Sequence, residues 1–166
     1  MEGVQGPDGA QLELRRLVEA YASAMDRGDL EEFGRLFVPD GALVVRAPGR
    51  DSPLGVFQGP AGVALIARLL GELYVATLHN ITTHRVVLNG DSATGTTYCL
   101  AYHVVGNGEG DALETLGVRY EDEYVRTPDG WRMRIRDATR LWSQTTPMDG
   151  EPLLIDRAAA QSRRPA

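Results

Sequence analysis

Three ionisable side chains in this 166-residue sequence have the types that proton-transfer chemistry needs: Asp26, His79 and His103. An imidazole that is held by a carboxylate through one nitrogen has a fixed tautomer, and its other nitrogen can then remove a proton from carbon. A second imidazole could protonate a departing hydroxyl or stabilise a developing oxyanion. If the fold brings the three together, the sequence predicts abstraction of a proton next to a carbonyl or another activating group.

Each of these residues also has a structural interpretation. Asp26 follows Met25 at the end of an apolar stripe and could simply hydrogen-bond the turn that comes next. A single histidine in a strand, such as His103, is often a buried residue with satisfied nitrogens. Two histidines and a carboxylate could also form a facial triad for iron, but the three residues lack a local metal-binding spacing, so we expect no metal and no cofactor. Cys99 is expected to pack within a strand.

His79 and His84 lie five residues apart in the alternating stretch "LYVATLHNITTHRVV", residues 73–87. Successive side chains of a regular strand point to opposite faces, so an odd spacing predicts opposite directions. We therefore expect His84, which precedes Arg85, to be a solvated or interface residue outside the site.

The first half of the sequence favours helices that could position Asp26. Apolar residues recur at three- and four-residue spacing from about 11 to 27, which predicts an amphipathic helix stopped by Gly28. Asp29 is predicted to cap a short second helix that ends at Pro39. The stretches "ALVVRA" and "VFQGP" read as strands, and "AGVALIARLLGEL" predicts a third helix.

The second half changes to the periodicity of strands. Four long runs lie at about 75–88, 92–105, 113–127 and 131–142, and the turns "NGDS", "GNGEGD" and "TPDG" between them have hairpin compositions. Helices followed by an antiparallel meander predict an α+β fold. We expect three N-terminal helices packed on a curved antiparallel sheet, with a cone-shaped pocket between them.

The last of these runs alternates apolar and basic residues. This pattern predicts a strand with its apolar side inward and its basic side outward, facing solvent or another subunit. The inward set would be Trp131, Met133 and Ile135, and the outward set Arg132, Arg134 and Arg136.

Bulk properties limit the function further. The formal charge is −6 and the basic residues are scattered, which argues against nucleic-acid binding. No stretch is apolar enough for the membrane, and the start "MEGVQGPDGAQ" lacks the features of a signal peptide, so we expect a cytoplasmic location. We expect one domain over 11–145, between a flexible segment at 1–10 and a C-terminal extension at 146–166.

The order of elements is similar to that of the SnoaL-like branch of the nuclear transport factor 2-like superfamily. The resemblance covers about residues 11–145 and is carried by "YASAMDRGDLEEFGRLFVPDGALV", "FQGPAGVALIARLL", "TLHNIT", "GDSATGTTYCLAYHV" and "DEYVRTPDGWRMR". It implies a cone-shaped α+β barrel. It says little about the substrate, because this fold hosts both enzymes and non-enzymes.

The resemblance also implies roles for individual residues. Lyases of this fold place a catalytic aspartate at the end of the first helix and a histidine early in the strand after the third helix, which Asp26 and His79 match. Scytalone dehydratase has a second histidine on the next strand, matched by His103. Bile acid 7-dehydratase pairs its aspartate with a tyrosine and uses an arginine in the last strand, for which Tyr21 and Arg140 are the candidates, although Tyr21 also fits a packing role.

We therefore expect a cofactor-independent lyase, a dehydratase or a related isomerase or polyketide cyclase, acting on a hydrophobic ring compound of the polyketide or steroid-like type. Met25 stands where scytalone dehydratase has a tyrosine, which argues against scytalone itself. The alternative is a non-catalytic module that binds a small ligand or a protein in the same cone. The expected pocket lining comprises Tyr21, Met25, Phe37, Leu69, Tyr120 and Arg140.

Self-association is a further expectation. The predicted sheet has a broad outer face that would carry Leu100, Tyr102 and Val104, and such a face would leave an apolar patch in water. Relatives with these motifs form dimers or trimers, so the resemblance implies a homodimer or homotrimer.

Overall fold

The computed structural model describes residues 7–106 and 111–148, which form three helices and one mixed, mostly antiparallel sheet of six strands. The helices are α1 (Pro7–Arg27), α2 (Leu30–Arg35) and α3 (Gly59–Leu73). The strands are β1 (Phe37–Arg46), β2 (Gly55–Gln58), β3 (Ala76–Asn89), β4 (Ser92–Gly106), β5 (Asp111–Thr127) and β6 (Gly130–Met148). This α+β arrangement confirms the fold class predicted from the sequence.

Local sequence signals explain where the helices begin and end. Gly28 follows α1 with a φ of 65°, a conformation that glycine adopts without strain, so the first helix stops there. The Asp29 carboxylate accepts a hydrogen bond from the backbone N–H of Glu32 at 2.9 Å and caps α2, as the sequence predicts. Pro60 lies in the first turn of α3, where its missing N–H costs nothing.

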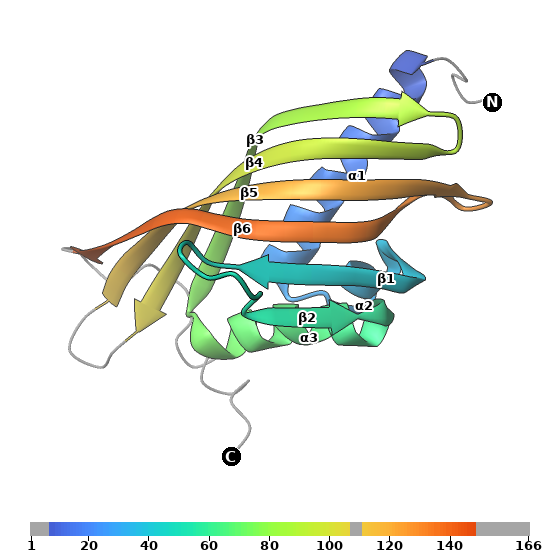
Figure 1. Ribbon diagram of the computed structural model, residues 1–166. Coiled ribbons are helices and arrows are strands. Elements are labelled where there is room, and N and C mark those ends of the chain that lie inside the picture. The colour runs from blue at the N-terminus through green and yellow to red at the C-terminus, as the bar shows by residue number, and fades with distance from the viewer. Residues whose placement is uncertain (1–6, 107–110, 149–166) are drawn as a thin grey trace.

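The sheet has the order β2-β1-β6-β5-β4-β3, so β3 lies at one edge and the short β2 at the other. Neighbours pair in antiparallel fashion except β1 and β6, which are parallel and are separated in sequence by β2, α3, β3, β4 and β5. In Figure 1, α1 crosses behind the long strands and α3 lies beside β1 and β2. The face toward the helices is called the inner face below, and the opposite one the outer face.

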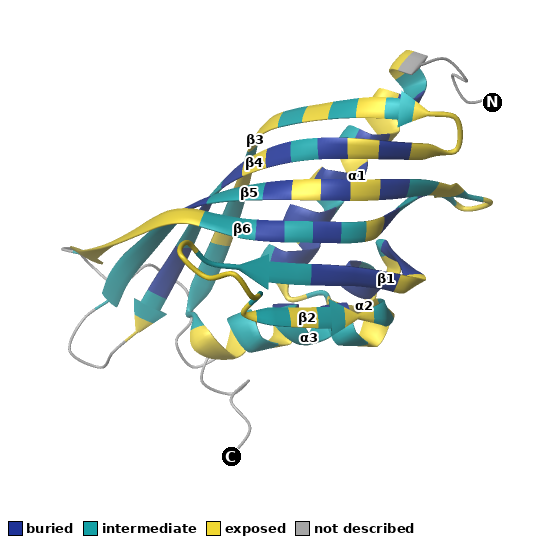
Figure 2. Ribbon diagram, viewed as in Figure 1, coloured by how far each residue is buried: buried dark blue, intermediate teal, exposed yellow. Residues whose placement is uncertain are grey.

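Side chains on β4 to β6 alternate between these faces, as the bands of buried and exposed residues in Figure 2 show. The inner face of β4 carries the small residues Thr97, Cys99 and Ala101 and then His103, all buried. The small side chains leave space beneath the helices for larger groups from α1 and β5. The inner face therefore holds both the core and the candidate site.

A β-bulge in β3 overturns the prediction that His79 and His84 face opposite ways. Ile81 pairs with Cys99 and His84 pairs with Thr97, so β3 uses one more residue than β4 in this interval, and Thr82 and Thr83 are both exposed. The extra residue reverses the alternation beyond it. His84 is consequently half-buried on the inner face, with its Nε2 3.5 Å from the Tyr124 hydroxyl oxygen.

A second irregularity corrects the prediction for β6. Glu123 pairs with Ile135 and Tyr124 with Met133, which leaves Arg134 as the extra residue. The alternation is reversed after it, so Arg136 points inward and is completely buried while Ile135 is only partly buried. Arg136, which was predicted to be part of the basic outer row, is therefore part of the core.

The observed boundaries also differ at the ends of the chain. The first helix begins at Pro7, so residues 7–10 of the predicted flexible segment are helical. The last strand continues to Met148, three residues into the predicted C-terminal extension. The rest of both predicted segments lies outside the described residues.

Candidate functional site

The carboxylate of Asp26 binds His79 at two points and Thr77 at a third. The Nδ1 atom of His79 lies 2.6 Å from Oδ1 of Asp26, and the backbone N–H of His79 donates to Oδ2 at 2.8 Å. The Thr77 hydroxyl donates to Oδ1 at 3.0 Å. The last turn of α1 and the start of β3 are therefore joined at the site, and the imidazole has one fixed orientation.

Electrostatics assigns the tautomer of this pair. Partial burial raises the pKa of the Asp26 carboxyl, but the hydrogen bonds from the ring and backbone of His79 and from Thr77 outweigh it, so the pKa ends below its ordinary value. An ionised carboxylate can only accept, so Nδ1 of His79 carries a proton and donates it. The remaining nitrogen, Nε2, then has a free electron pair when the ring is neutral and can act as a base.

His103 lies beside this pair without a hydrogen bond of its own. Its ring centroid is 5.4 Å from that of His79, its side chain is 7% exposed, and both ring nitrogens lack partners among the described residues. Burial, and then the nearby His79, lower the pKa of His103 to about 4. His103 is therefore neutral at pH 7, with one donor and one acceptor available to a ligand.

Both histidines line a cavity of about 200 Å³ between the inner face and α1 and α3. Of the six expected lining residues, Tyr21, Met25, Tyr120 and Arg140 line it. Arg46 and Tyr74 also line it, and the other lining residues are apolar: Leu43, Val45, Leu54, Ile66, Leu70, Leu116, Val118 and Ala138.

The expected contacts of Phe37 and Leu69 with the cavity are wrong. Phe37 packs in the core against Tyr21 and Phe33, with ring centroids 6.4 and 6.2 Å away. On α3, Ile66 and Leu70 are four residues apart and face the cavity, and Leu69 lies about 100° around the helix from Leu70. The amphipathic pattern alone does not say which apolar positions face a cavity and which face the core.

Sequence reasoning missed two polar residues next to His103. Glu114 is the residue directly opposite His103 in the β4–β5 register, and its Oε2 lies 3.9 Å from Nδ1 of His103. Tyr74, at the end of α3, stacks on the His103 ring at 4.3 Å and donates its hydroxyl to the same Oε2 at 2.8 Å. The signal was present, since counting back from the "GNGEGD" turn pairs position 103 with 114.

Two arginines also line the cavity. Arg46 donates from Nε to both carboxylate oxygens of Asp137, at 2.9 and 2.7 Å, and its charge is neutralised there. Within 7–106 and 111–148, Arg140 has no ion-pair partner. The cavity thus has, beside its apolar walls and the two histidines, an arginine without an ion-pair partner among the described residues.

A second polar cluster lies on the inner face farther along the strands. Asp122 accepts two hydrogen bonds from Arg136, both 2.8 Å long, and both side chains are fully buried. The Tyr124 hydroxyl and the Thr97 hydroxyl also donate to Asp122, at 2.6 and 3.3 Å. The Arg136 guanidinium lies against the rings of Tyr21 and Tyr120, 4.1 and 4.3 Å from their centroids.

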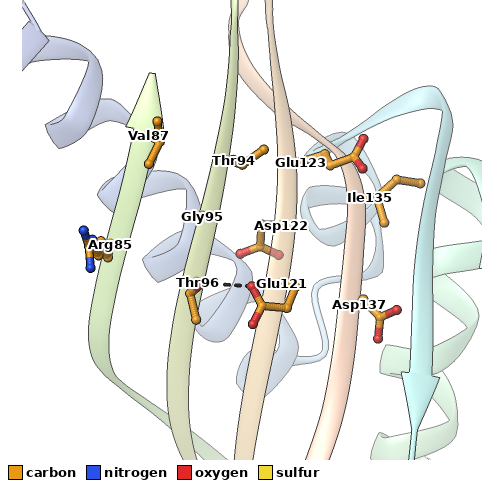
Figure 3. A pocket seen from close by; sticks show the side chains of 10 residues that line it. All are labelled: Arg85, Val87, Thr94, Gly95, Thr96, Glu121, Asp122, Glu123, Ile135 and Asp137. Atoms are coloured by element: carbon orange, nitrogen blue, oxygen red, sulfur yellow. Dashed lines mark hydrogen bonds between the residues drawn. The ribbon is translucent and has the colours of Figure 1, made fainter. Parts of the chain in front are cut away.

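The outer face carries a larger hollow of about 530 Å³. Figure 3 shows the side chains that line it on β3 to β6, with the Thr96 hydroxyl bonded to Glu121 at 2.8 Å. None of the three predicted catalytic residues lines this hollow. The groups suited to proton transfer lie in the smaller cavity on the inner face.

Two further observations concern metal ligands and membrane spans among the described residues. Within those residues, no cluster of three or more histidine, cysteine, aspartate or glutamate side chains is arranged to hold a metal ion. Asp26 and His79 bind each other at 2.6 Å instead of converging on a common point. None of the described helices is both long and apolar enough to cross a membrane.

With this geometry in place, comparison with known families assigns the chain to the SnoaL-like domain family, whose model matches residues 10–137. The fold is that of the nuclear transport factor 2-like superfamily. The resemblance read from the sequence is confirmed.

Individual relatives support the same assignment. The uncharacterized protein Rv2910c of Mycobacterium tuberculosis is 31% identical over 138 residues, which are 81% of this chain and 87% of that protein. Among solved structures, Kfla4162 from Kribbella flavida superposes with a TM-score of 0.75 at 22% identity, covering 84% of this chain and 95% of that one. A hexachlorocyclohexane dehydrochlorinase, LinA type 2, has a TM-score of 0.71 at 20% identity, covering 86% and 93%.

Proposed function

We propose that this protein is a cofactor-independent lyase that removes water from a hydrophobic ring compound. The observation that carries the proposal is the 2.6 Å contact between Asp26 and Nδ1 of His79, which leaves Nε2 of His79 as a base on the wall of an apolar cavity. Had packed apolar groups separated these two residues, the proposal would have failed at this point. A dehydrochlorinase with the same fold also catalyses an elimination, which supports this class of reaction.

The proposed step begins with the transfer of a proton from carbon to Nε2 of His79. The electron pair of the C–H bond forms the new double bond while the C–O bond of the neighbouring carbon breaks. The departing oxygen takes a proton, which His79 can return, and leaves as water. Asp26 stabilises the imidazolium that exists between these two transfers, because its carboxylate lies against the other ring nitrogen.

His103 is assigned to the oxygen of the substrate. Its two unpartnered nitrogens and its position 5.4 Å from the His79 ring allow one small polar group to contact both imidazoles. Because the pKa of His103 is lowered to about 4, it acts as a neutral hydrogen-bonding group at pH 7 and not as a charged acid. The same geometry would serve an isomerase or a cyclase that begins with the same proton abstraction.

The cavity favours a compact substrate. Its volume of about 200 Å³ lies below the range of about 300–1,000 Å³ that is usual for ligand sites, so one or two fused rings fit better than a steroid skeleton. Arg140 supplies a positive charge at the wall that an oxygen-rich or anionic substituent would neutralise. A small hydroxylated polyketide-type ring meets these requirements.

The test is a screen of hydroxylated mono- and bicyclic carbonyl compounds, in which mass spectrometry detects the loss of one water. We expect the unaltered protein to convert at least one compound class, and Asp26→Asn to lose that activity. Glu121→Gln, which changes a carboxylate on the outer face, should retain it. Binding without water loss across the screen would favour the alternative function, a module that only binds its ligand.

Self-association through the outer face is a separate proposal. Leu100 and Tyr102 are half-buried there and Val104 is buried, and the exposed apolar groups include Tyr98, Leu141 and Trp142 instead. These three line one outer groove and supply the apolar surface that a second copy of the chain could cover. We expect a dimer or trimer in sedimentation velocity at micromolar concentration, and dissociation by Tyr98→Glu. A monomeric unaltered protein would refute this.

A further inference from the structure

His103 belongs to a row of three residues that crosses the sheet. Thr77 on β3 is opposite His103, and His103 is opposite Glu114 on β5. Thr77 is bonded to the carboxylate of Asp26, so this row has a carboxyl group on each side of the histidine. Directly opposite residues in antiparallel strands have side chains within reach of each other. The register therefore sets Glu114 beside His103.

The carboxylate of Glu114 is anchored where it can act on His103. The Tyr74 hydroxyl donates to Oε2 at 2.8 Å, and the Tyr74 ring lies against His103. Burial and the neighbouring Glu114 raise the pKa of Tyr74 to about 12, so its hydroxyl remains a donor throughout the neutral range. One carboxylate offers about four lone-pair positions, so the bond from Tyr74 leaves Glu114 able to accept another hydrogen.

Glu114 distinguishes between the two neutral forms of His103. Its Oε2 is 3.9 Å from Nδ1, with both groups largely buried, and electrostatic interactions are stronger there than in water. A proton on Nδ1 presents positive charge to the carboxylate, and a lone pair on Nδ1 presents negative charge. The first form is favoured, and it leaves the lone pair on Nε2, the nitrogen on the other side of the ring.

We propose that Glu114, anchored by Tyr74, is a positioning residue that keeps the proton of His103 on Nδ1, so that Nε2 accepts a hydrogen bond from the substrate. The substrate group that His103 recognises is then a donor, a ring hydroxyl, and not a carbonyl oxygen. This inference rests on the proposed function only where it assigns that hydroxyl to the departing group.

The assignment completes the proposed reaction. The departing oxygen receives its proton from His79 while its own O–H hydrogen points at Nε2 of His103, so the water is held by both rings as the C–O bond breaks. The two carboxylate–histidine pairs thus have different tasks. Asp26 supports an imidazole that changes charge, and Glu114 supports one that stays neutral.

The decisive experiment is the measurement of the His103 tautomer at pH 7 by long-range ¹H–¹⁵N spectroscopy of the ring nitrogens. The sequence has three histidines, and the signals of His103 are identified by their loss in His103→Gln. We expect the proton on Nδ1 in the unaltered protein. Glu114→Met should lower the ratio of the Nδ1–H to the Nε2–H form by about tenfold, the effect of removing one charged hydrogen-bonding partner. Tyr74→Phe, a smaller change, should shift the ratio in the same direction.

Glu121→Met is the matched control, because Glu121 lies on the same strand but on the outer face, and it should leave the tautomer unchanged. A proton on Nε2 in the unaltered protein would overturn the proposal. An unchanged tautomer in Glu114→Met, folded by circular dichroism, would overturn it as well.

Binding of an alcohol and its matching ketone tests the substrate class without any turnover. With 2-tetralol and 2-tetralone as probes, we expect calorimetry to give about tenfold tighter binding of the alcohol, and a ratio near one in Glu114→Met. Preference for the ketone in the unaltered protein would refute the hydroxyl assignment. Neither the tautomer measurement nor the binding measurement depends on water loss. The proposed role of Glu114 and the proposed lyase activity can therefore be refuted independently.

Discussion

Two polar clusters share the inner face of the sheet, and they differ in how completely their hydrogen bonds are satisfied. Asp122 accepts hydrogen bonds from Arg136, Tyr124 and Thr97. At the other cluster, Asp26 is equally well bound, but neither ring nitrogen of His103 has a hydrogen-bond partner among the described residues, and this residue lines a cavity. Asp122 has a donor at both carboxylate oxygens, although Nη1 of Arg136 lacks a hydrogen-bond partner among the described residues, and this cluster is a rigid part of the core. The imidazole of His103, without such partners, keeps hydrogen-bonding capacity for a ligand.

The largest effect, on stability, should come from breaking the cluster around Asp122 and Arg136. Asp122→Ala leaves the buried Arg136 without its counter-charge, and we expect the free energy of unfolding to fall by about 3–5 kcal/mol in urea titrations. Replacing both residues, with Asp122→Leu and Arg136→Met, should restore most of that loss because no unpaired charge remains. A loss below about 1 kcal/mol in the single variant would show that the pair is not essential to the core.

The next largest effect should distinguish the two clusters by their contribution to catalytic turnover. Asp26→Asn should reduce turnover of an identified substrate about 100-fold or more, because the amide cannot stabilise the imidazolium of His79. His79→Ala should be at least as damaging, and the double variant little worse, because residues that act as a unit are not additive. Undiminished turnover in folded His79→Ala would end the lyase proposal.

The pH dependence of stability should identify His103. Its folded pKa of about 4 lies below the ordinary 6.5, so between these values the unfolded chain binds more protons and acid favours unfolding. From pH 7.5 to pH 4.5 we expect the unaltered protein to lose about 2 kcal/mol more stability than His103→Asn. The lowered pKa of Asp26 acts in the same direction, but below its ordinary 3.8, outside this range. Parallel pH curves for the two proteins would contradict this.

The smallest effect should come from His84. It faces the same side of the sheet as His79 but contacts Tyr124, in the cluster around Asp122, through a long hydrogen bond of 3.5 Å. His84→Ala should keep turnover within about twofold and cost about 1 kcal/mol or less of stability. A loss of activity equal to that of His79→Ala would mean that the site extends along the sheet.

Much of the fold was predictable because its local signals agree with one another. Four features have periodicity or turn chemistry that a single sequence displays: the first helix over about 11–27, its stop at Gly28, the cap at Asp29 and the four long strands. The meeting of Asp26 and His79 was predicted from the resemblance and from the chemistry of the pair. Their catalytic role remains a prediction.

Two of the incorrect predictions arose because strand parity was extended across bulges. The directions of His84 and Arg136 depend on an extra residue at Thr82–Thr83 and at Arg134, where composition gives no warning. Glu114 and Tyr74 were missed because their importance comes from contacts with His103 that only the register and the end of α3 create. The predictions that Phe37 and Leu69 line the cavity were wrong because an amphipathic pattern does not distinguish residues that face a cavity from residues that pack in the core.

The bulge at Thr82 and Thr83 also affects whether β3 can pair with a strand of another molecule. Its strand, β3, is the long edge of the sheet, and an unbroken edge of 14 residues would be a template for pairing with another chain. The bulge interrupts that template at its middle. Arg15 of α1 donates to the carbonyl oxygens of Ile81 and Thr82, both at 3.4 Å, so part of the edge is already occupied. The irregularity that turns His84 inward is thereby also a barrier to aggregation.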